Sequence, residues 1–288
     1  PTDARGGHAP SRTRIRTLGA GDLPAFLALT GKDPVVNVFA EYRGQISRLD
    51  PAWLGGEMWG RFQGQDLVAA CHVGANLVPI GGRPEAAREF AERALEKGRT
   101  SSTIFGPQQS VREFFDVVGG QWGQPRDLRW EQPHLELAGS PKVAADPLVR
   151  RTMVRELSVL YPACVAMYTE EVGVSPEVGG TGDLYYARVR QLITRGWSFS
   201  RIEDGRVVFK AEVSCATARA AQIQGVYVAP ERRGEGLAAR GMAAVVEQVR
   251  ATIAPTVSLY VNEWNQPARA AYARCGFTET SRFATVLY

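Results

Sequence analysis

The stretch GVYVAPERRGEGLAARG, from Gly225 to Gly241, decides how the second half of the chain is interpreted. Within it, Gly234 and Gly236 lie where a strand-like run changes to a helical one. Glycine lets the main chain approach a ligand without an intervening Cβ, and the start of a helix presents unpaired N–H groups and a positive dipole end. The stretch therefore predicts a loop that binds phosphate groups.

Two common phosphate-binding patterns do not fit this loop. The P-loop pattern G-x-x-x-x-G-K-[ST] matches from Gly236 to Gly241, but Met242 stands where Lys is required. The dinucleotide pattern G-x-G-x-x-G/A matches from Gly234 onward, but the residues APERR separate that glycine from the strand that ends at Val228. Only about 50 residues follow the loop, too few for the rest of a doubly wound sheet.

A third pattern fits the loop. VYVAPERRGEGLA resembles the pyrophosphate loop of the GCN5-related N-acetyltransferase (GNAT) superfamily, in which a strand ending V-x-P precedes Q/R-x-x-G-x-G/A and a long helix. Glu231 replaces the usual Gln or Arg, although the neighbouring arginines can still face the phosphates. The resemblance implies acetyl-CoA as cofactor. It assigns coenzyme binding to Val226, Tyr227, Val228, Arg232, Arg233, Gly234, Glu235, Gly236, Leu237, Ala238, Asn262 and Asn265.

A second match follows at the expected distance. LYVNEWNQPARAAYARCGF resembles the later motif of the same family, a strand with an Asn near its end followed by N-x-x-A-x-x-x-Y-x-x-x-G-F. Family members splay their fourth and fifth strands, and the pantetheine arm enters the gap. The resemblance therefore implies that residues 226–228 lie on one lip of such a gap, and Asn262 and Asn265 on the other. It covers residues 148–288 well and the first half only in its order of elements.

The motif also suggests an acid and an oxyanion donor for acetyl transfer to an amine. The amine must be neutral, the carbonyl oxygen needs a hydrogen-bond donor, and the leaving thiolate needs a proton. The resemblance places Tyr272 where the family carries the acid for the thiolate, although a phenol there can also be a packing residue. It implies that a backbone N–H near Val226 is the oxyanion donor.

The sequence leaves the general base open among several carboxylates. Glu212 could point into the cleft from the strand RVVFKAEV, or could lie beside Lys210 on a solvated edge. Glu170 and Glu171 end a helix where the family's lid meets the acceptor, and would attract a cationic amine or draw protons through water. They could equally be the polar end of a helix. Glu263 is a further candidate on the fifth-strand lip.

The two halves of the chain share one order of elements. Each shows a strand, two helical segments, a hairpin, a strand, a helix, a strand and a helix, with hairpins at Gly64–Gln65 and Asp204–Gly205. We predict a mixed α/β (α+β) fold of two GNAT-like domains, with two unrelated α+β domains as the alternative. The expected divisions are a disordered terminus (1–13), a degenerate GNAT-like domain (14–140), a linker (141–147) and the catalytic domain (148–288).

The first half lacks the residues for acetyl transfer. Gly81 and Gly82 precede its helix without the R-x-x-G-x-G/A pattern, and alignment of the two later motifs places Phe115 against Tyr272. A phenylalanine cannot protonate a thiolate. We hypothesise a degenerate copy that shapes the acceptor site of the second half.

Composition excludes several classes of protein. The net charge of +4 is spread without a basic, aromatic-rich cluster, which argues against nucleic acid as a partner. No run approaches the roughly 18 apolar residues of a membrane span. The thiols are expected to be core residues of a cytoplasmic protein and, with the histidines, show no metal-binding spacing. These residues are Cys71, Cys164, Cys215, Cys275, His8, His72 and His134.

The resulting prediction is an acetyl-CoA-dependent N-acetyltransferase that acts directly on a primary amine of a small molecule, peptide or protein. A monomer and a homodimer both remain open. A non-catalytic acyl-CoA-binding or regulatory module is the principal alternative. A tandem enzyme that acylates an aminoacyl or thiol-precursor amine, held by the first half, is another.

Overall fold

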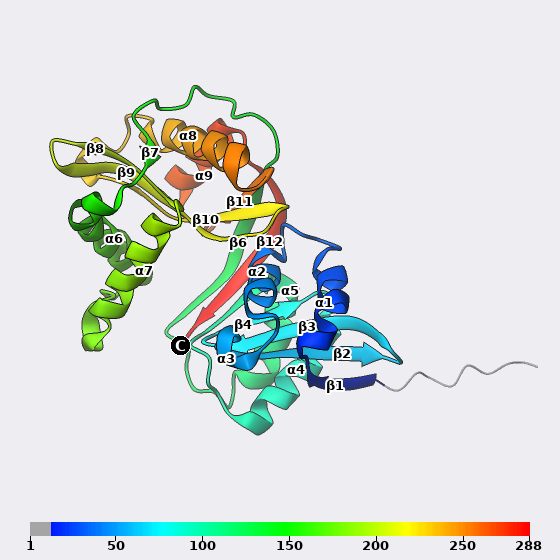
Figure 1. The fold of residues 1–288 in the computed structure, drawn as a ribbon. Coiled ribbons are helices and arrows are strands. Elements are labelled where there is room, and N and C mark those ends of the chain that lie inside the picture. The colour runs from blue at the N-terminus through cyan, green and yellow to red at the C-terminus, as the bar shows by residue number, and fades with distance from the viewer. Residues whose placement is uncertain (1–12) are drawn as a thin grey trace, which may run out of the picture. The chain divides into compact units, whose positions relative to one another are not determined.

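The computed structural model describes residues 13–288 and divides the chain into two compact units. The first contains the residues up to Gln132 together with Arg282–Tyr288, and the second is Pro133–Ser281. Both are mixed α/β units, as predicted (Figure 1). The terminus expected to be disordered, residues 1–13, lies outside the described residues except for Thr13. The expected linker, residues 141–147, lies within the second unit.

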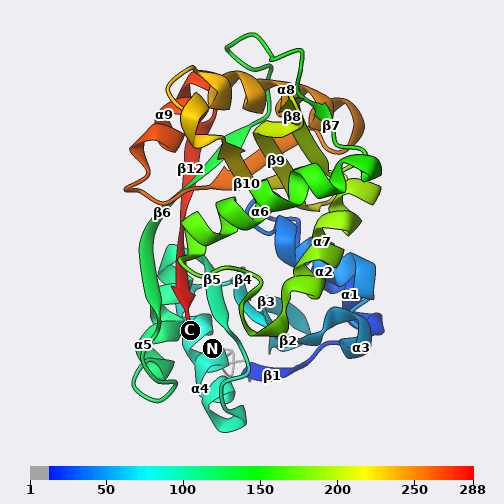
Figure 2. The ribbon, with the colours of Figure 1, turned by 90° about the vertical axis from the view of Figure 1, so that its left-hand side faces the viewer.

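The first unit is a mixed sheet with helices on both faces. Its strand order is β1-β2-β3-β4-β5-β12, and its neighbouring strands are antiparallel except for the parallel pair β4–β5. Residues alternate between the faces along β3, so that Ala69 and Cys71 face the core beneath α4 and α5, while Ala70 faces the core beneath α1, α2 and α3. Figure 2 shows α4 and α5 side by side. The elements are β1 (Thr13–Thr17), α1 (Leu23–Thr30), α2 (Val38–Ser47), α3 (Pro51–Leu54), β2 (Gly56–Gln63), β3 (Asp66–Gly74), β4 (Asn76–Ile80), α4 (Pro84–Lys97), β5 (Thr103–Pro107), α5 (Gln108–Val118), and the parts of β6 (Asp127–Leu137) and β12 (Thr278–Leu287) that belong to this unit.

The second unit has the same layered design. Its strand order is β6-β11-β10-β9-β8-β7, with β10 and β11 parallel. One core lies beneath α8 and α9 and another beneath α6 and α7, on the two faces of the sheet (Figure 1). Gly241 lets α8 lie close to β9, because a Cβ there would be 2.7 Å from the Phe209 ring. The elements are β7 (Arg150–Arg151), α6 (Leu157–Val172), α7 (Gly182–Thr194), β8 (Ser198–Glu203), β9 (Arg206–Ala216), β10 (Ala220–Val228), α8 (Leu237–Thr252), β11 (Thr256–Tyr260) and α9 (Gln266–Cys275).

Each sheet contains a strand segment from the other half of the sequence. Residues 134–137 of β6 pair with β11 in the second unit, and residues 283–287 of β12 pair with β5 in the first. The predicted catalytic domain, residues 148–288, includes the final strand, and no element was assigned from the sequence to residues 127–137. An alternating apolar pattern identifies a strand but not its partner, because pairing is decided by contacts distant in sequence.

Pairing between β10 and β11 is short. The paired residues run only from Ala220 with Thr256 to Gln222 with Ser258, although β10 continues to Val228. The other edge of β10 stays paired with β9 as far as Val228. The second unit therefore has a strand whose later residues lack a neighbouring strand on the β11 side.

The final strand should contribute to the stability of the first unit. Val286 is fully buried in the core beneath α4 and α5. We expect Val286→Ala to lower the free energy of unfolding by about 2 kcal/mol, because two methyl-sized groups leave a packed core. Urea denaturation measures this change. Thr278→Ala removes a similar volume from an exposed position of the same strand and should change stability by less than about 0.5 kcal/mol. Equal effects of the two variants would contradict the assigned packing.

Candidate active site

The glycine loop between β10 and α8 is open. Gly234 and Gly236 have φ values of 86° and 76°, and a Cβ built on either would meet nothing within 4 Å. Helix α8 begins at Leu237, and no side chain caps its first turn. The N–H groups of that turn are consequently available to an anion.

The corresponding turn of the first unit is closed by packing. Gly81 and Gly82 also have positive φ values, but a Cβ at Gly81 would lie 3.0 Å from Leu29 and one at Gly82 would lie 2.6 Å from Ala69. Helix α4 then begins with Pro84, which has no N–H group to donate. This turn lacks the open space found at its counterpart in the second unit.

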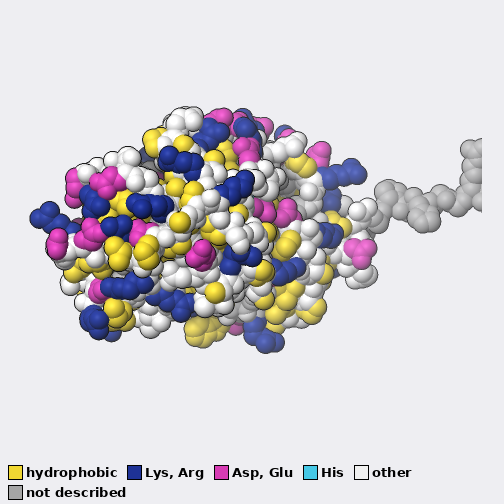
Figure 3. Space-filling model, turned by 90° about the horizontal axis from the view of Figure 1, so that it is seen from above, with side chains coloured by type: hydrophobic (Ala, Val, Ile, Leu, Met, Phe, Trp, Pro, Cys, Tyr) yellow, Lys and Arg dark blue, Asp and Glu magenta, His cyan; other side chains and the backbone are white. Residues whose placement is uncertain are grey.

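Both arginines of the glycine loop are held by carboxylates. Arg232 bonds to Glu203 at 2.8 Å and to Glu235 at 2.9 Å, and Arg233 makes a two-pronged ion pair with Glu170 at 2.8 and 3.0 Å. The sequence predicts that these arginines can face phosphates, whereas in the structure they face carboxylates. Figure 3 shows basic and acidic side chains interspersed over the face that it displays. Phosphate binding by either arginine would require an exchange of partners.

The two sides of the β10–β11 gap carry different side chains: Val226, Tyr227 and Val228 on β10, and Asn262 and Asn265 after β11. Val226 and Val228 are partly buried against the core beneath α8, and Tyr227 packs against the core beneath α6. On the other lip, Asn262 is buried, and the side chain of Asn265 accepts a hydrogen bond from the Ala268 N–H at 3.2 Å. Asn265 therefore caps α9.

Tyr272 lies in the core beneath α8 and α9. It is 6% exposed, and its ring meets that of Phe277 edge-on, with 6.0 Å between centroids. Burial raises the pKa of the Tyr272 phenol, and the negative charge of Glu171 raises it further. The phenol is therefore protonated at neutral pH.

Lys210 and Glu212 form a buried ion pair in the middle of β9. The Nζ and Oε2 atoms are 3.2 Å apart, and the residues are 1% and 6% exposed. The alternative of a solvated edge at this position is therefore wrong, because α6 and α7 cover this face of the sheet. The other oxygen of Glu212 accepts a hydrogen bond from Gln224 on β10 at 2.9 Å.

A bulge in β10 faces this ion pair. The pairing of β10 with β9 shifts between Gln224 and Tyr227, and Gly225, at the bulge, has a φ of 62°. A Cβ at Gly225 would lie 3.1 Å from both the Lys210 Nζ and the Glu212 Cδ. Only glycine leaves the pair its present space.

No role at the site was predicted from the sequence for Lys210. The signal was available, because this is one of four lysines in the chain and it lies inside the otherwise apolar run VVFKA. Lysine is almost never fully buried unless it is paired. A lysine in such a run, two residues before a glutamate, indicates a buried pair.

The remaining acidic candidates have more exposed positions. Glu170 and Glu171 are exposed at the end of α6, and Glu170 is engaged by Arg233. Glu263 is half-buried, and its backbone carbonyl accepts a hydrogen bond from Arg269 at 3.0 Å.

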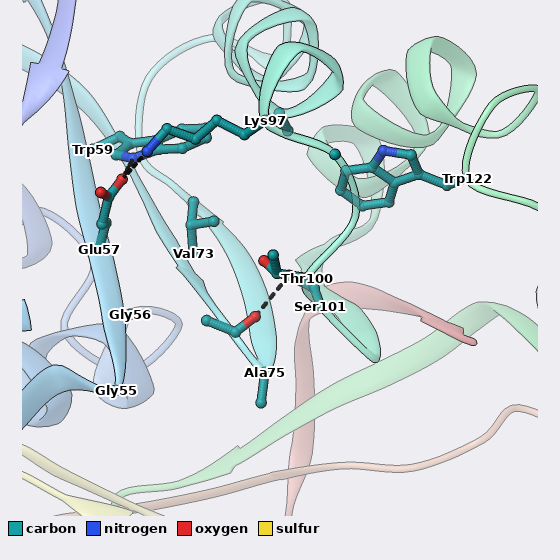
Figure 4. A pocket seen from close by; sticks show the side chains of 13 residues that line it. Gly55, Gly56, Glu57, Trp59, Val73, Ala75, Lys97, Thr100, Ser101 and Trp122 are labelled. Atoms are coloured by element: carbon teal, nitrogen blue, oxygen red, sulfur yellow. Dashed lines mark hydrogen bonds and ion pairs between the residues drawn. The ribbon is translucent and has the colours of Figure 1, made fainter.

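The first unit contains a cavity of about 370 Å³ at the start of β4 and β5 (Figure 4). It lies at the opposite end of these parallel strands from the Gly81–Gly82 turn. The Glu57 carboxylate accepts hydrogen bonds from the Lys97 Nζ at 2.7 Å and the Trp59 Nε1 at 2.5 Å. The Glu57 carboxylate at this cavity is therefore already paired with residues of the first unit. Among residues 13–288, no cluster of His, Cys, Asp and Glu could hold a metal ion.

Comparison with known proteins agrees with the geometry of the second unit. Residues 195–277 match the Acetyltransferase (GNAT) family, and residues 56–160 match a domain of unknown function, DUF4081. No curated protein matches the chain.

Several solved structures share the fold over nearly the whole chain. A GNAT-family acetyltransferase from Colwellia psychrerythraea is 14% identical, with a TM-score of 0.58 and coverage of 96% of this chain and 99% of that one. A GCN5-related N-acetyltransferase from Sphaerobacter thermophilus is 16% identical, with a TM-score of 0.57 and coverage of 97% and 96%. A tandem GNAT protein from the clavulanic acid biosynthesis pathway is 16% identical, with a TM-score of 0.52 and coverage of 95% and 98%.

Residues 195–277, in the second unit, thus match the GNAT acetyltransferase family, and the fold along the chain is similar to that of solved GNAT structures. Acetyl-CoA is the cofactor of this class of enzyme. Within the described residues, no helix is both long enough and apolar enough to span a membrane.

The crowding at Gly225 generates a test of the site geometry. We expect Gly225→Ala to destabilise the protein by at least about 1 kcal/mol more than Gly205→Ala, because both residues have positive φ but only the Gly225 Cβ meets the ion pair. The control, Gly205, lies in the β8–β9 hairpin with nothing within 4 Å of its Cβ. Urea unfolding of both variants measures the difference. Equal losses would show that the pair is not packed against the bulge.

Proposed function

We propose that the second unit transfers the acetyl group of acetyl-CoA directly to a primary amine of a small molecule, peptide or protein. One observation carries the proposal above the others. The part of β10 that lacks a β11 partner leads directly into the open glycine loop. Such an edge can accept an extended ligand arm, and the loop can accept its phosphates.

The residues around the gap fit coenzyme A. Gly234, Gly236 and Leu237 would hold the pyrophosphate through backbone N–H groups, while residues 226–228 would line the arm. Arg232 and Arg233 would add charge by exchanging their carboxylate partners for phosphate oxygens. Acetyl-CoA bound there would supply an activated thioester, and coenzyme A would be the leaving thiolate when the acetyl group passes to the amine. Glu235, Ala238, Asn262 and Asn265 complete the proposed coenzyme site.

Tyr272 is the proposed acid. Its raised pKa keeps the proton on the phenol oxygen at neutral pH, where it can be donated as a hydrogen bond or transferred. Cys275, on the same helix, is buried, and burial raises its pKa to about 11. A thiol in that state is a poor nucleophile, which supports direct transfer without a cysteine relay.

Glu212 is the proposed base. It is the candidate carboxylate that lies against the β10 bulge, and its approach to Gly225 is fixed by the Gln224 and Lys210 contacts. Glu170, Glu171 and Glu263 are assigned to attraction of the cationic amine. These carboxylates are more exposed than Glu212, so their negative charge can attract a cationic amine through the surrounding water.

The first unit is the proposed degenerate copy, because its glycine turn is filled by Leu29 and Ala69. The domain boundaries are proposed near the linker at residues 141–147, with residues 282–288 contributed to the first unit. We place the protein in the cytoplasm, because all four cysteines are free thiols. The small net charge of +4 and the interspersed charges on the face displayed in Figure 3 favour a partner that is neither nucleic acid nor membrane.

The Tyr272→Phe variant tests this function. We expect acetyl-CoA turnover with a responsive amine to fall by about 10²- to 10⁴-fold, because the acid is removed while the ring remains. Acetyl-CoA affinity, measured by calorimetry, should stay within about threefold of the wild type. A panel of primary amines, followed through release of free thiol, identifies the acceptor.

Tyr288→Phe is the matched control, since it removes a half-buried phenol in the first unit. It should leave turnover unchanged. A protein that binds acetyl-CoA but acetylates no amine would instead support the non-catalytic binding or regulatory module. Failure to bind acetyl-CoA would exclude both functions.

A further inference from the structure

Lys210 is a buried charged residue. The proposed roles of Tyr272 as acid and Glu212 as base do not explain why a lysine is buried at this position. Its side chain is 1% exposed, and its charge is compensated by Glu212, which is also buried. Burying two charges is costly, and such a pair is often no more stabilising than apolar residues of the same size. Stability alone is therefore a weak reason for a lysine at this position.

The surroundings of the pair favour a role at the β10 bulge. Glu212 is held from two sides, with Lys210 on one oxygen and Gln224 on the other. Gly225 opens the strand directly onto both charged groups, because it has no Cβ. A carboxylate in this buried position would favour its protonated form without a nearby positive charge. A protonated carboxyl group cannot accept a proton from an amine.

We propose that Lys210 is a positioning residue that keeps Glu212 ionised and fixed against the β10 bulge, so that Glu212 can take a proton from the acceptor amine. This inference rests on the proposed function. It assigns to Lys210 no contact with the acetyl group or the acceptor.

The other titratable groups near Lys210 are neutral in the relevant pH range. Cys164 on α6 has its pKa raised to about 11 by burial. Burial also raises the pKa of Tyr185 on α7 and of Tyr227 on β10. For Lys210 itself, burial opposes the charge, but Glu212 and Cys164 outweigh that effect and raise its pKa. Between pH 5 and pH 9, these neighbouring groups therefore keep one protonation state.

The test compares the pH dependence of turnover in full-length variants, using the responsive amine from the panel. We expect Lys210→Met to shift the acid limb of the kcat profile upward by about one pH unit or more, because the buried carboxylate loses its counter-charge. Lys210→Arg keeps the positive charge, so the acid limb of its kcat profile should lie close to that of the wild type. Glu212→Gln should lower kcat and remove the limb. Lys32→Met, at an exposed lysine, should leave the profile unchanged.

A second measurement does not depend on activity. In protein labelled with ¹³C at glutamate carboxyls, the signal lost in Glu212→Gln identifies Glu212, and its titration should move to higher pH in Lys210→Met. Circular dichroism and acetyl-CoA binding confirm that each variant is folded. If Lys210→Met turns over more slowly but neither its acid limb nor its Glu212 signal moves, Lys210 only packs the core and the inference is overturned. A wild type that acetylates no amine overturns the proposed function and this inference together.

Discussion

Hydrogen bonding between β10 and β11 stops at Gln222 and Ser258, and the rest of the site depends on that break. A parallel pair that continued would satisfy the backbone groups of β10 on both edges and leave nothing for a ligand. Because the pairing ends early, residues 223–228 keep a free edge that leads to the glycine loop. The same chemistry that builds a sheet can then hold an extended ligand, with the first turn of α8 at its end.

The bulge in β10 connects this free edge to the buried charges. The register shift between Gln224 and Tyr227 places Gly225 beside Lys210 and Glu212, so the strand that lines the gap also touches the proposed base. Glu212 is held by Lys210 and Gln224, and removing one partner of a buried ion pair typically costs about 3–5 kcal/mol because the other charge is left uncompensated. A carboxylate fixed in this way needs little reorganisation when a proton arrives. Tyr272 lies in the core beneath α8 and α9, and its protonated phenol is the proposed complementary donor.

Local features of the sequence predicted much of this arrangement. Gly234 and Gly236 mark the loop because their backbone requirement is local, and the Asn265 cap and Tyr272 follow from one helical motif. The apolar run around Lys210 indicates a buried pair with Glu212, but the helices that cover this face, α6 and α7, cannot be deduced from β9 alone. The ion pairs of Arg232 and Arg233 join elements distant in sequence. The pairing of residues 283–287 with β5 also joins segments distant in sequence, which strand propensity does not predict.

Hydrogen exchange of the backbone amides, with and without saturating acetyl-CoA, tests the role of the free β10 edge most directly. Binding in the gap predicts slower exchange in the segment from Ile223 to Leu237, which spans the edge and the glycine loop. The Gly81–Gly82 turn of the first unit should show no change, because its space is already filled. Protection at that turn instead, or bound coenzyme without protection of residues 223–237, would contradict the central claim.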